Sequence, residues 1–290
     1  MIINMIRGFC MALADSVPGV SGGTIAFLMG FYDEFIVSLD HIIKGTKQER
    51  TDAALFLLKL GAGWLIGMAL AVTVLAAVFE QGIYEVSSLF LGFILFAIPV
   101  MIYDERDSLK KPANSLFILP GAALVILISV IGTDSTADTG TMNTAMIIYS
   151  FIAGMCAISA MVLPGISGST ILLTFGLYMP VIDSLKCLMH LDFSGIILIV
   201  SVGFGILAGI FLSVGVIKKS MDRFRGQTIY TVVGMMIGSL YAIVQGPTTL
   251  KVPRQAMTME TFDIIFFAIG AAIVIGMQAA KIAASRKAAA

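Results

Sequence analysis

A helix-breaking motif inside strongly apolar sequence occurs twice in this chain, and it constrains the fold more than any other feature. Residues 17–39 read VPGVSGGTIAFLMGFYDEFIVSL, and residues 163–185 read LPGISGSTILLTFGLYMPVIDSL. Eleven of the 23 aligned positions are identical without a gap, at a constant offset of 146 residues in a chain of 290. We therefore interpret the chain as a tandem duplication, in which one structural unit is built twice.

The composition places this unit in a membrane. Hydrophobic residues make up 58% of the chain and charged residues only 12%, whereas a soluble domain carries about 25% charge. Several apolar runs reach the length of roughly 20 residues that a bilayer requires. The formal net charge is zero, so we expect no nucleic-acid partner. The first 16 residues lack a basic leader region and are expected to be mature protein.

The apolar runs predict an all-α polytopic membrane protein with two inverted-topology repeats, each a re-entrant helical hairpin plus three transmembrane helices. The first repeat is expected over 1–140, with the hairpin at 2–40 and spans at 53–79, 83–103 and 115–132. The second is expected over 141–290, with the hairpin at 142–185 and spans at 194–217, 228–245 and 262–283. Because each unit crosses the membrane an odd number of times, the second unit must lie in the membrane in the opposite orientation to the first, as in many transporters.

Basic residues gather in alternate connections between these segments. Three or more Lys or Arg lie in each of 41–52, 104–114, 218–227 and the tail from 281, whereas 80–82 and 133–141 hold none and 183–193 holds one. The positive-inside rule then puts the first set and both termini in the cytoplasm, in a multi-pass protein of the inner membrane. The basic connection 246–261 must be external and fits least well. Two full spans in place of each hairpin would satisfy the same pattern.

The turn motifs, residues 17–24 and 163–170, combine helix breakers with hydroxyl groups. Pro and Gly stop helix propagation and free backbone N–H and C=O groups, which is tolerable in a membrane only inside protein or beside a water-filled cavity. Glycine N–H groups, hydroxyls and the positive end of the following helix together favour an anion. Two inverted copies predict two anion sites face to face. The alternative is a break needed only for packing, with the hydroxyls bonded internally.

Two charges distinguish the first copy from the second. Arg7 aligns with Ala153 and Asp15 with Met161, and a charge inside an apolar segment is costly unless it is paired or hydrated. Eight residues apart on a helix, Arg7 and Asp15 lie on roughly the same face. We expect Arg7 to grip a phosphate and Asp15 to orient Arg7 or carry a proton. A structural salt bridge, or an Arg7 that extends to the membrane surface, remains the alternative.

At ADSVPGVSGGTIAFLMGFYDE (residues 14–34) and PGISGST (residues 164–170) the chain resembles the PopT-type polyprenyl-phosphate translocases over essentially its full length. The resemblance implies a flippase, and no enzyme, that returns undecaprenyl phosphate from the outer to the cytoplasmic leaflet for reuse in cell-envelope glycan synthesis. Together with the motif chemistry, it gives these candidate substrate-binding residues: Arg7, Asp15, Ser16, Gly19, Ser21, Gly22, Gly23, Thr24, Gly165, Ser167, Gly168, Ser169 and Thr170.

Two other functions remain alternatives. A small-anion carrier or channel would use the same turn motifs. The second motif also resembles the P-G-x-S-R-S motif of undecaprenyl-pyrophosphate phosphatases, but Gly22 and Gly168 stand where that family needs arginine, and no two glutamates lie four residues apart. We expect no catalytic residues, no cofactor and no metal site, since His41 and His190 have no ligand-spaced neighbour. A coupling proton or sodium ion and a homodimer are further possibilities.

Overall fold

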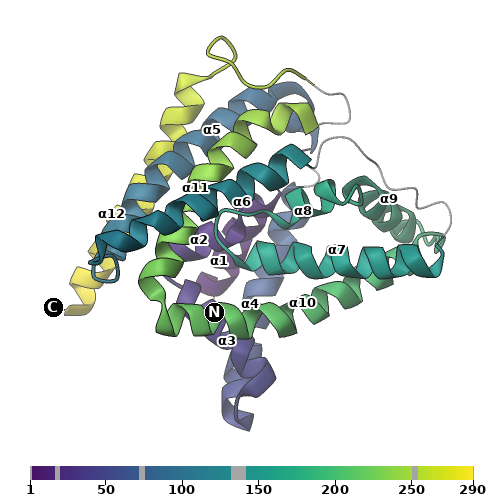
Figure 1. Ribbon diagram of the computed structural model, residues 1–290, viewed down its shortest axis with the longest axis horizontal. Helices are drawn as coiled ribbons and strands as arrows, with labels where there is room; N and C mark the ends of the chain where they lie inside the picture. The colour runs from purple at the N-terminus through teal and green to yellow at the C-terminus, as the bar shows by residue number, and fades with distance from the viewer. Residues whose placement is uncertain (1, 17–19, 72–75, 132–141, 250–253, 290) are drawn as a thin grey trace.

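The computed structural model describes residues 2–16, 20–71, 76–131, 142–249 and 254–289, and within these ranges every regular element is a helix (Figure 1). The first half contains α1 (Ile2–Asp15), α2 (Gly22–Leu28), α3 (Tyr32–Lys44), α4 (Lys47–Leu70), α5 (Ala76–Asp104), the 3-10 helix η2 (Pro112–Phe117) and α6 (Ile118–Ile131). The second half contains α7 (Thr144–Val162), α8 (Gly168–Thr174), α9 (Tyr178–Met189), α10 (Ile196–Arg223), α11 (Arg225–Gln245), the 3-10 helix η3 (Gly246–Thr249) and α12 (Ile264–Ala289).

Seven of the described helical segments are long and apolar enough to cross a membrane, which makes the chain an all-helical membrane protein. They are α4, residues 82–104 of α5, η2 with α6, α7, α10, α11 with η3, and α12. The 19-residue α7, which we expected as one arm of a re-entrant hairpin, is among them, whereas the 14-residue α1 is not. The number of spans rises to nine if each of two bent helix pairs is one span.

The bent pairs are the repeated segments. Helices α2 and α3 meet at 119°, and α8 and α9 meet at 111°. Each pair bends at a glycine in the left-handed region, Gly30 with φ +70° and Gly176 with φ +65°. Only glycine adopts that conformation without strain, and the two glycines are 146 residues apart. The duplicated sequence therefore produces a duplicated local structure.

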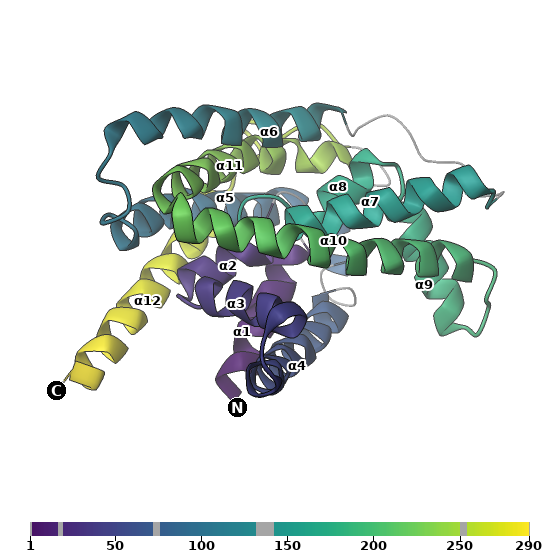
Figure 2. The same cartoon turned by 60° about the horizontal axis from the view of Figure 1, so that its bottom comes forward.

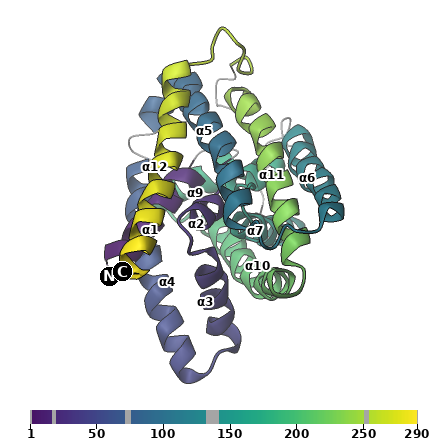
Figure 3. The same cartoon turned by 90° about the vertical axis from the view of Figure 1, so that its left-hand side faces the viewer.

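The two halves interleave in one layer of four helices. Figure 3 shows α12, α5, α11 and α6 side by side, in agreement with the contacts that α5 makes with α12, α11 with α5, and α11 with α6. Helices α5 and α11 are repeat equivalents, and so are α6 and α12. Each half thus contributes its last two long helices to a shared layer, and equivalent helices occupy equivalent places in it.

The remaining helices pack in two further equivalent pairs. Helix α1 lies on α4, and α7 lies on α10. Figure 2 shows these pairs beside the layer, with the short α2 near the middle of the bundle. Six of the seven residues of α2 are buried, so the first turn motif leads into the protein interior.

Glycines bring the paired helices into backbone contact. A Cβ atom added at Gly63 of α4 would overlap the carbonyl oxygen of Met5 in α1, and one at Gly205 of α10 would overlap that of Phe151 in α7. In both pairs a glycine four residues further on meets the same partner helix. Gly234 and Gly238 of α11 approach the backbone of Ile118 and Ala122 in α6 in the same way.

The helices extend beyond the apolar runs at several ends. Helix α4 begins at Lys47 because Thr46 and Glu49 form a reciprocal capping box, with Thr46 N–H donating to Glu49 Oε2 at 2.7 Å. It ends at Leu70, and α5 begins at Ala76, so the expected span 53–79 differs from both helices. Helix α10 likewise continues to Arg223. Lys, Arg and Glu are good helix formers and prolong these helices past the apolar sequence.

The connections divide between two ends of the molecule. In Figure 1 the α3–α4 connection lies at the bottom, and the α5–α6 and α10–α11 connections lie at the lower left with the end of α12. The α11–α12 connection lies at the top and the α9–α10 connection at the right. The connections rich in Lys and Arg therefore share one end, which we call the basic end.

Candidate functional site

The first turn motif is fixed by the hydroxyl of Ser21. Ser21 has extended backbone angles and caps α2, and its Oγ accepts a hydrogen bond from Gly23 N–H at 3.1 Å. The same hydroxyl lies 3.1 Å from the carbonyl oxygen of Leu163, to which it donates. Ser21 and Thr24 are completely buried. A serine before two glycines thus begins the helix and also reaches the second half of the chain.

The two turn motifs are in direct contact. Thr24 Oγ1 accepts a hydrogen bond from Gly165 N–H at 3.1 Å, and the Tyr32 hydroxyl donates to the carbonyl of Val162 at 3.2 Å. A Cβ atom at Gly23 would lie 3.1 Å from the backbone of Leu163, so glycine permits the close approach. The structure therefore brings together the two segments that the repeat predicted to face each other.

A carboxylate of the protein occupies the first turn motif. Asp15 is buried, with 7% of its surface exposed. Its Oδ1 accepts from Gly22 N–H at 2.7 Å, and its Oδ2 accepts from the indole N–H of Trp64 in α4 at 2.9 Å. The N–H groups of Gly22 and Gly23 were expected to face a ligand, but Asp15 and Ser21 are their partners in this structure. The Asp15 carboxyl group therefore takes the place at Gly22 N–H where a ligand anion was expected.

The second turn motif is arranged differently. Ser167 precedes α8 with extended backbone angles, but its hydroxyl pairs with that of Ser169 at 2.6 Å rather than with an amide. Met161 replaces Asp15 here, and Gly165 has a φ of +90°. Ser169 and Thr170 are half-buried. In this motif the buried Ser167 and the half-buried Ser169 bond each other, whereas the first motif is bonded to Asp15 and Leu163.

Three other candidate residues lie away from this contact or outside the described ranges. Arg7 donates to Asn4 at 2.9 Å and to Glu34 of α3 at 3.1 Å, and its guanidinium lies 4.6 Å from the centre of the Phe31 ring. Arg7 and Asp15 thus have separate partners, and the expected orientation of Arg7 by Asp15 is not seen. Ser16 donates to the Leu13 carbonyl at 2.7 Å and ends α1. Gly19 lies outside the described residues.

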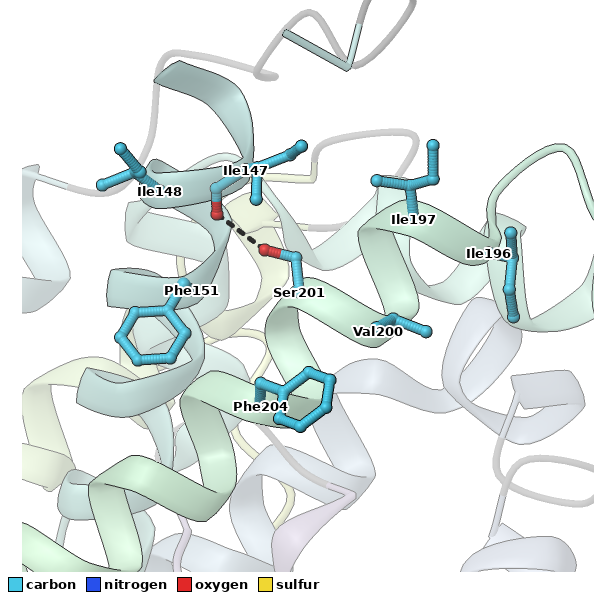
Figure 4. Close-up of a pocket in the computed structure, with 8 residues that line it drawn as sticks. All are labelled: Ile147, Ile148, Phe151, Ile196, Ile197, Val200, Ser201 and Phe204. Carbon is cyan, nitrogen blue, oxygen red and sulfur yellow. Dashed lines mark hydrogen bonds between the residues drawn. The ribbon is translucent and has the colours of Figure 1, made fainter. Parts of the chain in front are cut away.

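A groove between α7 and α10 was not predicted from the sequence. It has a volume of about 470 Å³ and is lined by Ile147, Ile148, Phe151, Ile196, Ile197, Val200, Ser201 and Phe204 (Figure 4). Its one polar side chain, Ser201, donates to the Ile147 carbonyl at 2.6 Å, so the wall is hydrocarbon. Such a groove suits an apolar chain and offers nothing to a headgroup.

A smaller pocket of about 190 Å³ lies beside the bend between α2 and α3. Its lining includes Asp33, Asp104, Glu105, Arg225 and Lys281. The described residues contain no group of three or more His, Cys, Asp or Glu side chains that could hold a metal ion. The charged side chains of this pocket come from α3, α11, α12 and the end of α5.

Comparison with known proteins identifies the family. A family model described as "VCA0040-like: Undecaprenyl phosphate translocase-like" matches residues 11–261. The chain belongs to this family. A polyprenyl-phosphate transporter of Staphylococcus aureus is 32% identical over 259 residues, which cover 86% of this chain and 88% of the relative. A polyprenyl-phosphate transporter of Vibrio cholerae is 32% identical over 256 residues, which cover 85% of this chain and 78% of the relative.

No solved structure matches the chain. The family match confirms the resemblance that the turn motifs carry, since these two relatives are named as transporters of polyprenyl phosphate. The family match includes both turn motifs and every described candidate residue except Arg7. The geometry above is therefore that of a polyprenyl-phosphate transporter family member.

Proposed function

We propose that this protein is a flippase that returns undecaprenyl phosphate from the outer to the cytoplasmic leaflet of the inner membrane, for reuse in cell-envelope glycan synthesis. The observation that carries the proposal is the direct contact between the two turn motifs, through Thr24 and Gly165 and through Ser21 and Leu163. Helix breaks with polar groups inside a membrane protein are typical of transporter binding sites. A phosphate headgroup fits such a site, and an apolar tail can stay in lipid.

The proposal includes an inverted repeat with the basic end in the cytoplasm. Two observations support it. Equivalent helices occupy equivalent places in the four-helix layer, and the connections rich in Lys and Arg gather at one end (Figure 1). Both termini of the chain would then be cytoplasmic. Alternating access follows naturally, because two related halves can expose the same central site to either side.

The headgroup would bind first at the second turn motif. Ser167 and Ser169 offer hydroxyls that bond only each other in this structure, and Gly168 and Thr170 lie beside them. At the first motif the phosphate must replace Asp15 at Gly22 N–H, because two anions cannot share one donor at short range. The Asp15 carboxylate then turns toward Trp64 alone or accepts a proton. Coupling of lipid transport to a proton or sodium ion, and the formation of a homodimer by this protein, remain predictions.

Transport is tested by reconstituting the purified protein in liposomes with a fluorescent polyprenyl phosphate. A quencher added outside bleaches only the outer leaflet, so the protein is expected to increase the fraction of lipid that is bleached over time. A rate equal to that of protein-free liposomes would rule out the flippase. Transport of inorganic phosphate in place of the lipid would favour the small-anion carrier.

An assay of hydrolysis separates the enzyme alternative. Polyprenyl pyrophosphate is incubated with the same preparation, and released phosphate is measured. We expect no release above the protein-free control, because the sequence lacks the motif arginine and the glutamate pair that the undecaprenyl-pyrophosphate phosphatases need. Release that depends on Ser21 or Ser167 would support the phosphatase instead.

A further inference from the structure

Two carboxylates of α3 bind cations from the second half of the chain. Asp33 accepts from Arg225, at the start of α11, with an oxygen–nitrogen distance of 2.9 Å. Asp40, which is buried, lies 2.6 Å from Lys218 Nζ near the end of α10. Arg225 also binds Glu105, the residue after α5, at 2.6 Å. Helix α3 is thereby tied to α10 and α11 of the second half at the basic end.

A third carboxylate ties α3 to its own hairpin. Glu34 lies 3.1 Å from the guanidinium of Arg7 in α1, which also covers the ring of Phe31. Phe31 is buried and directly precedes α3. We call the three ion pairs Asp33–Arg225, Glu34–Arg7 and Asp40–Lys218 the α3 latch.

The second half of the chain lacks the residues for an equivalent latch. In place of the three acids of α3 it has Met179, Pro180 and Lys186, and the positions equivalent to the three cations hold Ala153, Val72 and Phe79. Helix α3 packs on α4 of its own half and on α10 of the other half, whereas α9 packs on α8 and α10 of its own half. The ion pairs that join the two halves at the basic end therefore have no counterpart at the equivalent sequence positions of the other repeat.

The small pocket of about 190 Å³ lies directly behind the latch. Met101, which is buried, lines it together with Asp33 and Arg225. Three carboxylates and two cations give this pocket a formal charge of −1, which disfavours a phosphate. We therefore interpret the pocket as part of a closed path between the turn motifs and the basic end, and not as a second anion site.

We propose that the α3 latch holds the basic end closed over the two turn motifs, and that its opening connects them to that end. The inference rests on the proposed alternating access, since it names the contacts that select one of its two states. The carboxylates of Asp33 and Glu34 are exposed, and exposed ion pairs are individually weak, so these two pairs can break and re-form during a transport cycle. Because only one end carries the latch, the empty protein prefers the state that is closed there.

The latch is tested with a cysteine reporter at Met101. Met101→Cys is introduced after the native cysteines are changed to serine (Cys10, Cys156 and Cys187). A membrane-impermeant thiol reagent is applied to the basic end, and the labelling rate is measured. Neutralising the latch with Asp33→Asn, Glu34→Gln and Asp40→Asn is expected to raise the rate by about tenfold, since three pairs are lost together.

The matched control is Asp107→Asn in the same background. Asp107 pairs with Lys110 at 3.1 Å within one connection at the basic end, so its loss should leave the Met101→Cys labelling rate unchanged. Labelling of the latch variant at the rate of this control would overturn the proposal.

A charge reversal keeps the test decisive if the triple variant does not fold. Arg7→Glu alone is expected to speed labelling, and Arg7→Glu with Glu34→Arg is expected to restore the slow rate. Fast labelling that the reversal does not restore would show that the ion pair is not the cause. No substrate is present in these labelling experiments, so they test the latch independently of transport. If the transport assay fails but labelling changes as expected, the flippase proposal is wrong and the latch remains a conformational device.

Discussion

At the residue scale, the first turn motif depends on one buried carboxylate. Asp15 joins α1 to the start of α2 through Gly22 and to α4 through Trp64. Both donors would be unsatisfied without it, since neither lies where water is plentiful. The second motif has Met161 at this place and a pair of serine hydroxyls instead. The two motifs therefore share a sequence pattern but differ in the groups that they present.

Asp15→Leu is expected to lower the free energy of unfolding by about 2 kcal/mol, because two N–H groups lose their acceptor. It should also shift the fluorescence emission of Trp64, the single tryptophan of the chain. Detergent-solubilised protein can be measured for both properties, with Asp107→Asn as a surface control. Unchanged stability and emission would show that the carboxylate does not hold this turn.

The sequence analysis singled out Arg7 and Asp15 but did not predict their partners. Eight residues apart on one helix, they suggested a joint role. Their partners, Glu34 and Trp64, lie on other helices, and such tertiary contacts are not visible in helical spacing. One signal was available for Trp64: an indole N–H inside a membrane span needs an acceptor, and Asp15 is the nearby carboxylate of the first hairpin.

At the element scale, small residues decide how the helices pair. Helix α4 presents Gly63 and Gly67 to the backbone of α1, and α10 presents Gly205 and Gly209 to that of α7. Close backbone approach is a common basis of helix association in membranes, where lipid is as apolar as the side chains. These pairs hold the scaffold beside which the turn motifs meet.

Gly63→Ala is expected to destabilise the protein by about 1–3 kcal/mol, the usual cost of overpacking. Its new Cβ atom would overlap the Met5 carbonyl oxygen. Gly61→Ala on the same helix is the matched control, since a Cβ atom there meets nothing within 4 Å. Unfolding of both variants is compared in the same detergent. Equal stabilities would contradict the packing argument.

Hydropathy predicted where the helices are but not all of their ends. The apolar run alone suggested a start at residue 53 for α4, yet the helix begins at Lys47. The pattern Thr46-x-x-Glu49 is a recognisable capping box, so this end was readable in the sequence. The end of α4 and the start of α5 were harder to predict, because the sequence there is a continuous apolar run and hydropathy does not mark a boundary within it.

At the scale of the whole molecule, charge separates the two ends. The basic connections gather at one end (Figure 1), and the latch ties both halves together there. The repeat in the sequence predicted two related halves, and the reciprocal helix pairs agree with that prediction. The contacts of the latch could not be predicted, because two of its three ion pairs join residues more than 170 positions apart.

The proposed orientation predicts that Asp107→Cys and Ser194→Cys are labelled from opposite sides of the membrane. Both positions are exposed, the first in the α5–α6 connection and the second in the α9–α10 connection. Intact cells of a strain that expresses the cysteine-free background are treated with an impermeant thiol reagent. Only Ser194→Cys should react before the cells are opened. Reaction at both positions in intact cells would refute this topology.

The central claim is that the headgroup crosses the membrane between the two turn motifs. The most direct measurement is the flipping rate of fluorescent polyprenyl phosphate in liposomes that contain Ser167→Ala/Ser169→Ala. We expect a rate at least about tenfold below that of the unchanged protein, because hydrogen bonds to a charged group are worth about 1.5–3 kcal/mol. The control is Ser159→Ala/Ser213→Ala, whose hydroxyls each bond the carbonyl of their own helix at 2.7 Å. Equal rates for all three proteins would contradict the claim.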